Sequence, residues 1–245
     1  MSLQILLSGA TGAVGGAILE LIDSDDHYLL AGKASRLQFF EPDVEADVII
    51  DFSHPALLDQ TLAFAVRRSI PIIVGTTGLD HRLTKQIEQA AERVAVCHAA
   101  NFSLGVNLLV RLAGNAAGVL GKEYDIEILE AHHRRKLDAP SGTAKWLGQT
   151  VSAARGLDFE ASATYERSSQ RRARNSEEIG YQCMRGGDVA GEHTVYFLAD
   201  GERLELTHRA TDRRVFARGA LAAARCIVDE RPGMIDFADL VLGQR

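Results

Sequence analysis

The chain has 245 residues, enough for one large domain or two modest ones with a sizeable core. Hydrophobic residues make up 46% and charged residues 24% of it, which is ordinary for soluble globular proteins and excludes the disordered and fibrous classes. The formal net charge of -6 argues against nucleic acid or an anionic membrane as the main partner.

The cysteines and the first residues indicate the cellular compartment of the protein. Cys97, Cys183 and Cys226 are far apart, and their odd number fits a reducing cytosol better than a disulfide framework. The opening "MSLQILLSGATG" lacks a basic region, so we expect no export signal. No stretch approaches the length of a membrane span, so we predict a soluble, cytoplasmic protein.

A glycine-rich turn follows the first apolar segment. "LQILLSGATGAVGGAILELI" predicts a strand, a turn and a helix, with Gly9, Gly12 and Gly15 in a variant of the dinucleotide-binding pattern. Glycine is needed where the backbone turns tightly and approaches a pyrophosphate, and the helix amides then face the negative charge. A turn of this kind also occurs without a ligand.

The next eighty residues alternate between strands and helices. We expect strands at 27–32, 46–53, 71–78 and 94–103, and helices at 56–69 and 83–93. This order predicts a doubly wound, Rossmann-like parallel sheet, in which ligands bind beyond the carboxyl ends of the strands. The polar turns "GATG", "DFS", "GTTG" and "AANF" all fall at that edge, which favours a nucleotide site.

The end of the second strand bears on the choice of cofactor. An NAD-preferring site usually has an acidic residue there to bind the ribose 2'-hydroxyl group. This chain has Lys33, Ser35 and Arg36, and no acid before Glu41. These groups suit a 2'-phosphate, or they belong to a solvated loop.

The stretch "EAHHRRKLDAPSGTA" at 130–144 is the most unusual part of the chain. It continues a half-buried strand in "YDIEIL", and adjacent strand residues point to opposite faces, so His132 and His133 are poorly placed to share a metal ion. A helix is expected from "PSGTAKWLG" onward, with Ser141 as its N-cap. Gly142 and Thr143 then offer amides and a hydroxyl to a carboxylate or phosphate.

The remaining residues complete a two-domain organisation. We expect a long, mobile connection with solvated arginines at 165–178, a hairpin around Asp200-Gly201, and a closing helix at 215–228. The predicted domains are a dinucleotide-binding domain, 1–102 plus 216–245, and an inserted α+β domain, 103–215.

Several motifs together resemble one family. "EAHHRRKLDAPSGTA" is similar to the signature of the 4-hydroxy-tetrahydrodipicolinate reductase (dihydrodipicolinate reductase) family of the bacterial and plant lysine pathway. "DFS", "GTTG", "AANFSLGVN", "RGGDVAGEHTV" and "ERLELTHRATDRRVFARGA" also resemble that family and occur in its order, so that the resemblance covers nearly the whole chain. The turn departs from the family, because Ala13-Val14 stands where many members have Arg-Met, which removes a possible phosphate contact.

The resemblance implies an activity and a set of site residues. The family reduces a cyclic, unsaturated imine with two carboxylates, using NADPH or NADH, and forms homotetramers through sheets of the second domain. It implies His132 as acid/base residue, Lys136 as proton donor, and His133, Gly142 and Thr143 as substrate-binding residues. The implied cofactor contacts are Gly9, Ala10, Thr11, Gly12, Ala13, Val14, Lys33, Gly75, Thr76, Thr77, Ala99, Ala100, Asn101 and Phe102, with no metal.

This chemistry explains the basic stretch. Cations and a helix N-terminus suit a dianionic substrate, and hydride delivery to a conjugated imine must be completed by a proton. A basic, solvated edge is the alternative interpretation. Short-chain dehydrogenases share the glycine pattern but need Tyr-x-x-x-Lys, which none of the five tyrosines provides. A non-catalytic sensor of NADP is the remaining rival, and it has no reason to keep His132, Lys136 and Gly142 together.

Overall fold

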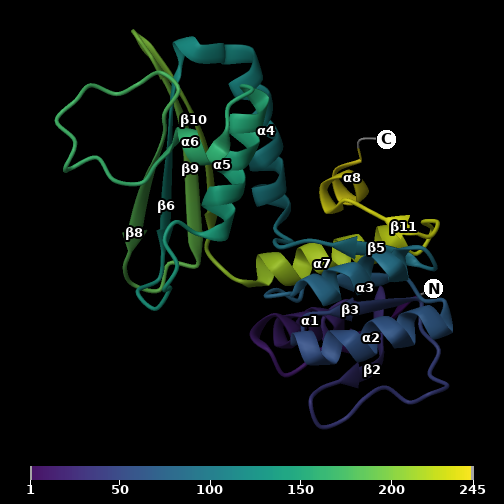
Figure 1. Cartoon of the computed structure of the whole chain (residues 1–245). Coiled ribbons are helices and arrows are strands. Elements are labelled where there is room, and N and C mark those ends of the chain that lie inside the picture. The colour runs from purple at the N-terminus through teal and green to yellow at the C-terminus, as the bar shows by residue number, and fades with distance from the viewer. Residues whose placement is uncertain (1, 244–245) are drawn as a thin grey trace. The chain divides into compact units, whose positions relative to one another are not determined.

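The structure is a computed structural model that describes residues 2–243, and the chain divides into two compact units. Unit 1 comprises Met1–Leu104 and Arg213–Arg245, and unit 2 comprises Gly105–Asp212. The second unit is therefore an insertion between two segments of the first (Figure 1). Its limits differ from the predicted domain boundaries by only a few residues.

Unit 1 is built on a six-stranded sheet whose paired strands all run parallel. The strands lie side by side in the order β11 (Gly233–Met234), β5 (Ala95–His98), β4 (Ile72–Val74), β3 (Val48–Asp51), β1 (Leu3–Ser8) and β2 (Tyr28–Ala34). Strand β1 lies between β2 and β3 in the sheet, so the order of the strands along the chain reverses direction at β1. The predicted doubly wound sheet is confirmed.

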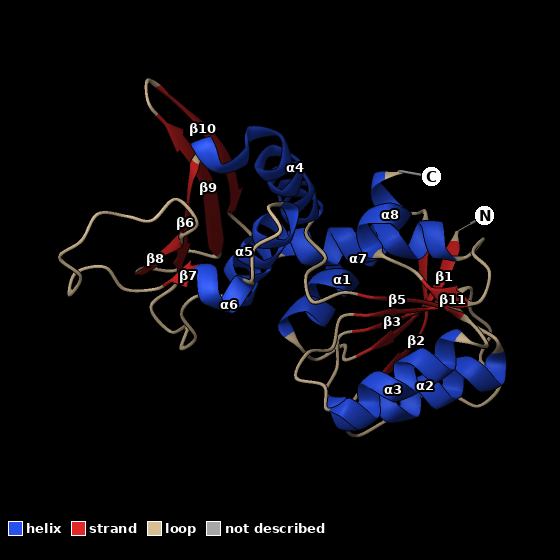
Figure 2. Cartoon of the chain, turned by 45° about the horizontal axis from the view of Figure 1, so that its top comes forward, coloured by secondary structure: helices blue, strands red, loops and turns tan. Residues whose placement is uncertain are grey.

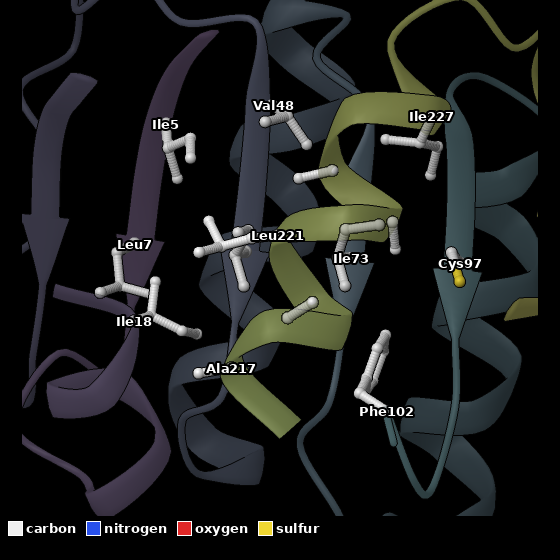
Figure 3. Packing of buried hydrophobic residues seen from close by; sticks show 14 of the residues in the cluster. Ile5, Leu7, Ile18, Val48, Ile73, Cys97, Phe102, Ala217, Leu221 and Ile227 are labelled. Carbon is white, nitrogen blue, oxygen red and sulfur yellow. The ribbon is translucent and has the colours of Figure 1, made fainter. Parts of the chain in front are cut away.

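Helices cover both faces of this sheet (Figure 2). Alternate side chains of β1 go to opposite faces, so Ile5 and Leu7 pack in one buried cluster and Leu6 in the other. The first cluster includes side chains of α1 (Ala13–Asp23), α7 (Arg214–Ile227) and α8 (Phe237–Leu242), and the second those of α2 (Pro55–Arg68) and α3 (His81–Ala91). Figure 3 shows α7 lying over the sheet, with Ala217, Leu221 and Ile227 in the buried cluster between helix and strands.

Unit 2 is a mixed sheet with helices on one face. Its strands lie in the order β10 (Glu202–Ala210), β9 (Gly191–Ala199), β6 (Asp125–His132), β8 (Ile179–Arg185) and β7 (Ala163–Thr164). The predicted hairpin is β9 and β10, joined at Asp200-Gly201. Helices α4 (Leu104–Leu120) and α5 (Gly142–Ala154) bury their apolar sides against β6, β8 and β9, and the short α6 (Phe159–Ser162) precedes β7.

The prediction that no stretch approaches the length of a membrane span is wrong for one segment. Leu104–Glu123, which contains α4, is 20 residues long and, by length and composition alone, apolar enough to cross a membrane. The buried side chains of α4, among them Val106, Leu109 and Ala113, belong to the core of unit 2. The apolar character of this helix is therefore explained in part by packing against the sheet.

The prediction of solvated arginines at 165–178 is wrong for two of them. Arg174 is 17% exposed and bonds the Asp125 carboxylate at 2.5 Å and the main-chain oxygen of Ile126 at 2.8 Å. Arg167 bonds Glu127 at 3.0 Å and Glu178 at 2.9 Å. Acidic side chains of β6 are distant in sequence, so the sequence alone did not show that they would meet this basic segment.

Candidate active site

The predicted cofactor residues of unit 1 gather at the carboxyl ends of its strands. Residues 9–12 connect β1 to α1 and residues 13–14 begin α1, Lys33 is near the end of β2, and residues 75–77 and 99–102 follow β4 and β5. Since β1, β2, β4 and β5 run parallel in one sheet, all four segments lie at the same edge. This is the edge at which open α/β sheets bind ligands.

The glycine turn is closely packed against main chain. Gly9 has φ +86°, and a Cβ placed on it would lie 2.3 Å from the carbonyl oxygen of Phe52. A Cβ on Gly15 would lie 2.2 Å from the carbonyl oxygen of Gly9. Gly12 is the N-cap of α1 and supplies no side-chain bond to the helix amides. The turn thus fits a dinucleotide, because main chain and helix N-terminus can approach a pyrophosphate.

Asp51, which the sequence did not assign a role, joins two of the segments at this edge. Its buried carboxylate accepts hydrogen bonds from the Thr76 hydroxyl at 2.5 Å and from the Ser53 hydroxyl at 2.9 Å and 3.0 Å. The Ser53 amide in turn donates to the Thr76 hydroxyl oxygen at 2.8 Å. Thr76 is 2% exposed, and its hydroxyl joins the segment after β4 to Asp51 and Ser53 at the end of β3.

A hollow of about 340 Å³ lies beside the end of β2. Its walls are the segment 35–39, with Ser35 and Arg36, and the start of α2, with Ala56, Leu57 and Gln60. Lys33 is exposed on β2 but does not line the hollow. Arg36 is thus the cation that lines this hollow, and Lys33 lies two residues before its first wall residue, Ser35.

Phe102 is one of the predicted cofactor residues, and its side chain lies in the hydrophobic core. It is 1% exposed, and its ring packs against those of Phe52 and Phe237 with centroids 5.3 Å and 4.9 Å apart. A Cβ on Gly219 of α7 would lie 1.6 Å from the Phe102 carbonyl oxygen. The side chain of Phe102 is therefore part of the unit 1 core.

In unit 2, His132 is the last residue of β6, and its ring is held by a carboxylate. Glu130 lies two residues earlier on the same face of the strand and accepts a hydrogen bond from His132 Nδ1 at 2.5 Å. The Glu130 side chain is fully buried, and that of His132 is 11% exposed. Burial alone would raise the pKa of Glu130, but hydrogen bonds from His132, Arg185 and Cys183 outweigh it and lower that pKa to about 2.

Arg185 connects this pair to the loop that follows β6. Its guanidinium binds both oxygens of Glu130, at 2.6 Å and 2.8 Å, and donates to the main-chain oxygen of Asp138 at 2.5 Å. The Asp138 carboxylate pairs with Lys136 at 2.8 Å, and this contact lowers the pKa of Asp138. The predicted residues His132 and Lys136 are thus linked through Glu130, Arg185 and Asp138.

The start of α5 reaches the same carboxylate. The Ser141 amide donates to Glu130 at 3.1 Å, and the Ser141 hydroxyl accepts from the Ala144 amide at 3.2 Å, which confirms Ser141 as the N-cap. The same hydroxyl lies 3.0 Å from Nε2 of His193, whose pKa burial and the neighbouring His132 lower to about 3. Gly142 and Thr143 form the first turn of the helix, with Gly142 exposed.

These contacts place a histidine, a lysine and a helix N-terminus in one network within unit 2. Such a set can bind anionic groups and move a proton. His133 follows His132 directly and is half-buried, and its carbonyl oxygen accepts from the Lys136 amide at 3.1 Å. Among residues 2–243, no three His, Cys, Asp or Glu side chains are grouped so as to hold a metal ion.

Known proteins resemble the chain over most of its length. Residues 3–102 match the family model described as "Dihydrodipicolinate reductase, N-terminus", and residues 105–241 match "Dihydrodipicolinate reductase, C-terminus". A 4-hydroxy-tetrahydrodipicolinate reductase from Magnetococcus marinus is 50% identical over 200 residues, covering 80% of this chain and 74% of the relative. Another, from Pseudoalteromonas translucida, is 39% identical and covers 97% of both chains.

A solved structure shares the fold. It is described as a dipicolinate-bound dihydrodipicolinate reductase from Paenisporosarcina sp. TG-14, and it matches with a TM-score of 0.78 at 20% identity, over 96% of this chain and 98% of that one. At this identity the likeness speaks for the fold, whereas the relatives and the family models speak for the family. The chain belongs to the dihydrodipicolinate reductase family of pyridine-nucleotide-dependent oxidoreductases.

Proposed function

We propose that the chain reduces 4-hydroxy-tetrahydrodipicolinate, by way of dihydrodipicolinate, to tetrahydrodipicolinate in the diaminopimelate route of lysine biosynthesis. The curated relatives carry the name of this reductase. The observation that supports it most directly is the network in unit 2 that ties His132, the Lys136 loop and the start of α5 to one carboxylate. It combines a proton donor with positive groups for a dianion.

The roles divide between the two units. The cofactor, when bound at the strand edge of unit 1, supplies the hydride, and residues 9–14, 75–77 and 99–101 would hold it there. In unit 2, His132 acts as the acid/base residue and Lys136 donates a proton and binds a carboxylate. His133, Gly142 and Thr143 bind the substrate, with the α5 amides turned to one of its carboxylates.

Turnover tests this assignment against a sensor of NADP. Purified protein is mixed with NADPH and enzymatically generated substrate, and the absorbance of the reduced nicotinamide is followed. Consumption of NADPH that depends on the imine is expected. Binding of NADPH without consumption would identify the sensor instead.

For the cofactor, NADPH should serve at least as well as NADH. No acid stands at the end of β2, and Arg36 and Ser35 line the adjoining hollow while Lys33 is exposed nearby. Arg36→Ala and Lys33→Ala should each raise the KM for NADPH more than that for NADH. Equal effects on both cofactors would remove the argument for a 2'-phosphate seat.

A planar dicarboxylate should compete with the substrate. Pyridine-2,6-dicarboxylate can place one carboxylate at the α5 N-terminus and the other near Lys136, so it should inhibit more strongly than pyridine-2-carboxylate. Equal inhibition by the two acids would contradict a site with two carboxylate seats. We further propose a homotetramer in the cytoplasm, for which light scattering of the purified protein should give four times the chain mass.

A further inference from the structure

Glu130 is the most heavily bonded carboxylate in the unit 2 network. Its Oε2 atom faces His132 Nδ1 at 2.5 Å and Arg185 at 2.8 Å, and its Oε1 atom faces Arg185 at 2.6 Å and the Ser141 amide at 3.1 Å. Its side chain is fully buried. A buried carboxylate bound by a guanidinium through both oxygens is fixed in position, because rotation would break two charge-assisted bonds.

Strand pairing brings these side chains together. Glu130 and His132 are two residues apart on β6 and therefore share a face. The parallel neighbour β8 places Arg185 opposite His132, and the antiparallel neighbour β9 places His193 opposite Glu130. The carboxylate thus has bonded partners from β6, β8 and the start of α5, and a neighbour from β9.

The contact determines which nitrogen of His132 carries a proton. An ionised carboxylate can only accept hydrogen bonds, so Nδ1 of His132 must be the donor. The other nitrogen, Nε2, then remains for exchange with a reacting group. It lies beside Gly191, where a Cβ would come within 3.1 Å of it, so the glycine leaves room for the ring.

We propose that Glu130 is a positioning residue that fixes the ring and tautomer of His132, so that Nε2 is the nitrogen that exchanges a proton with the substrate. Arg185 and the Ser141 amide hold Glu130 in place for this task. The proposal rests on the proposed function for its kinetic consequences, although the tautomer itself can be measured without substrate.

The kinetic experiment compares Glu130→Gln, His132→Gln and the double variant. A glutamine amide has one accepting oxygen where the carboxylate has two, so in either orientation its NH₂ group faces an N–H donor. Turnover of Glu130→Gln should fall at least about tenfold. The loss should not exceed the contribution of proton transfer itself, which is roughly 10²- to 10⁴-fold. The substrate KM should stay within about twofold, because Glu130 touches no substrate in this scheme.

The double variant separates positioning from a general structural role. If Glu130 acts only through His132, Glu130→Gln/His132→Gln should turn over no more slowly than His132→Gln alone. Losses that multiply in the double variant would overturn the proposal. Glu130→Asp retains the charge and should recover part of the turnover lost in Glu130→Gln.

Glu127→Gln is the matched control. Glu127 is on the same strand but on the opposite face, and two arginines, Arg167 and Arg174, bind its carboxylate at 3.0 Å and 3.2 Å. The same change of carboxylate to amide beside guanidinium groups should leave turnover within about twofold of the wild type. A loss as large as that in Glu130→Gln would also overturn the proposal.

A nitrogen NMR spectrum of histidine-labelled protein gives a readout that needs no activity. The His132 signals are assigned by their loss in His132→Gln. In the wild type Nδ1 should be protonated at every pH at which the chain is folded, and this preference should weaken or reverse in Glu130→Gln. Protonation on Nε2 in the neutral wild-type ring would overturn the proposal even if Glu130→Gln does not fold, whereas absent wild-type turnover would overturn only the proposed function.

Discussion

At the strand ends of unit 1, Gly9 and Gly15 place main chain against main chain, whereas at the end of β6 in unit 2 charged side chains are packed against one another. In the first arrangement, peptide groups lie at fixed positions where a ligand can contact them. In the second arrangement, a ligand meets side chains whose protonation can change. The difference matches the work proposed for each unit, since a nucleotide has only to be held while an imine must also receive a proton.

The largest effect is expected in unit 2, from Lys136→Ala. The Lys136 ammonium group is proposed both to bind a substrate carboxylate and to donate a proton, so its loss should lower turnover by about 10²- to 10⁴-fold and raise the substrate KM as well. Steady-state kinetics measure both. Arg135→Ala is the control, because Arg135 is an exposed cation one residue away and its loss should leave both constants close to wild type. Equal damage from the two changes would mean that the stretch works as a diffuse basic field.

Acid should weaken unit 2 through Glu130. Its pKa is about 2 in the folded chain and 4.5 ordinarily, so the ionised form is favoured by folding. That stabilisation is complete above about pH 4.5 and is lost as the pH falls through about 2. Urea unfolding at a series of pH values should show the wild type more stable than Glu130→Gln at neutral pH, by an amount that shrinks below pH 4.5. A difference that stays constant down to pH 2 would contradict these contacts.

The smallest effects come from neighbouring glycines in α1 of unit 1. A Cβ on Gly15 would meet the Gly9 carbonyl oxygen, so Gly15→Ala should lower the free energy of unfolding by about 1–3 kcal/mol and weaken NADPH binding. Gly16 has no atom within 4 Å of such a Cβ, so Gly16→Ala should raise the free energy of unfolding by about 0.5–1 kcal/mol. Urea unfolding and NADPH fluorescence titration check both. Similar behaviour of the two variants would mean that the close approach at Gly15 is unimportant.

Most of unit 1 could be predicted from the sequence because its signals are local. Short apolar strands, intervening helices and polar turns recur at regular spacing, and the parallel sheet follows from that order. Strand β11 and helix α8 were missed, since a strand of two residues and a helix of six are too short to show a clear periodicity. Asp51 was visible in "DFS", but its bond to Thr76 joins residues 25 positions apart.

The unit 2 site was predicted only in part because its contacts cross between strands. The alternation of Ile126 and Ile128, carried forward by two and four residues, puts Glu130 and His132 on the buried face, and this signal was available. Strand β8 was not predicted, so Arg185, 55 residues from Glu130, had no reason to be placed beside it. His193 was expected in the hairpin, yet its position opposite Glu130 depends on a register that the sequence does not state.

The turnover number of His132→Gln, at saturating NADPH and substrate, tests most directly the claim that unit 2 supplies the proton while unit 1 holds the cofactor. The account predicts a loss of about 10²- to 10⁴-fold, with little change in substrate KM and unchanged NADPH binding. A variant that retains most of the wild-type turnover would contradict it.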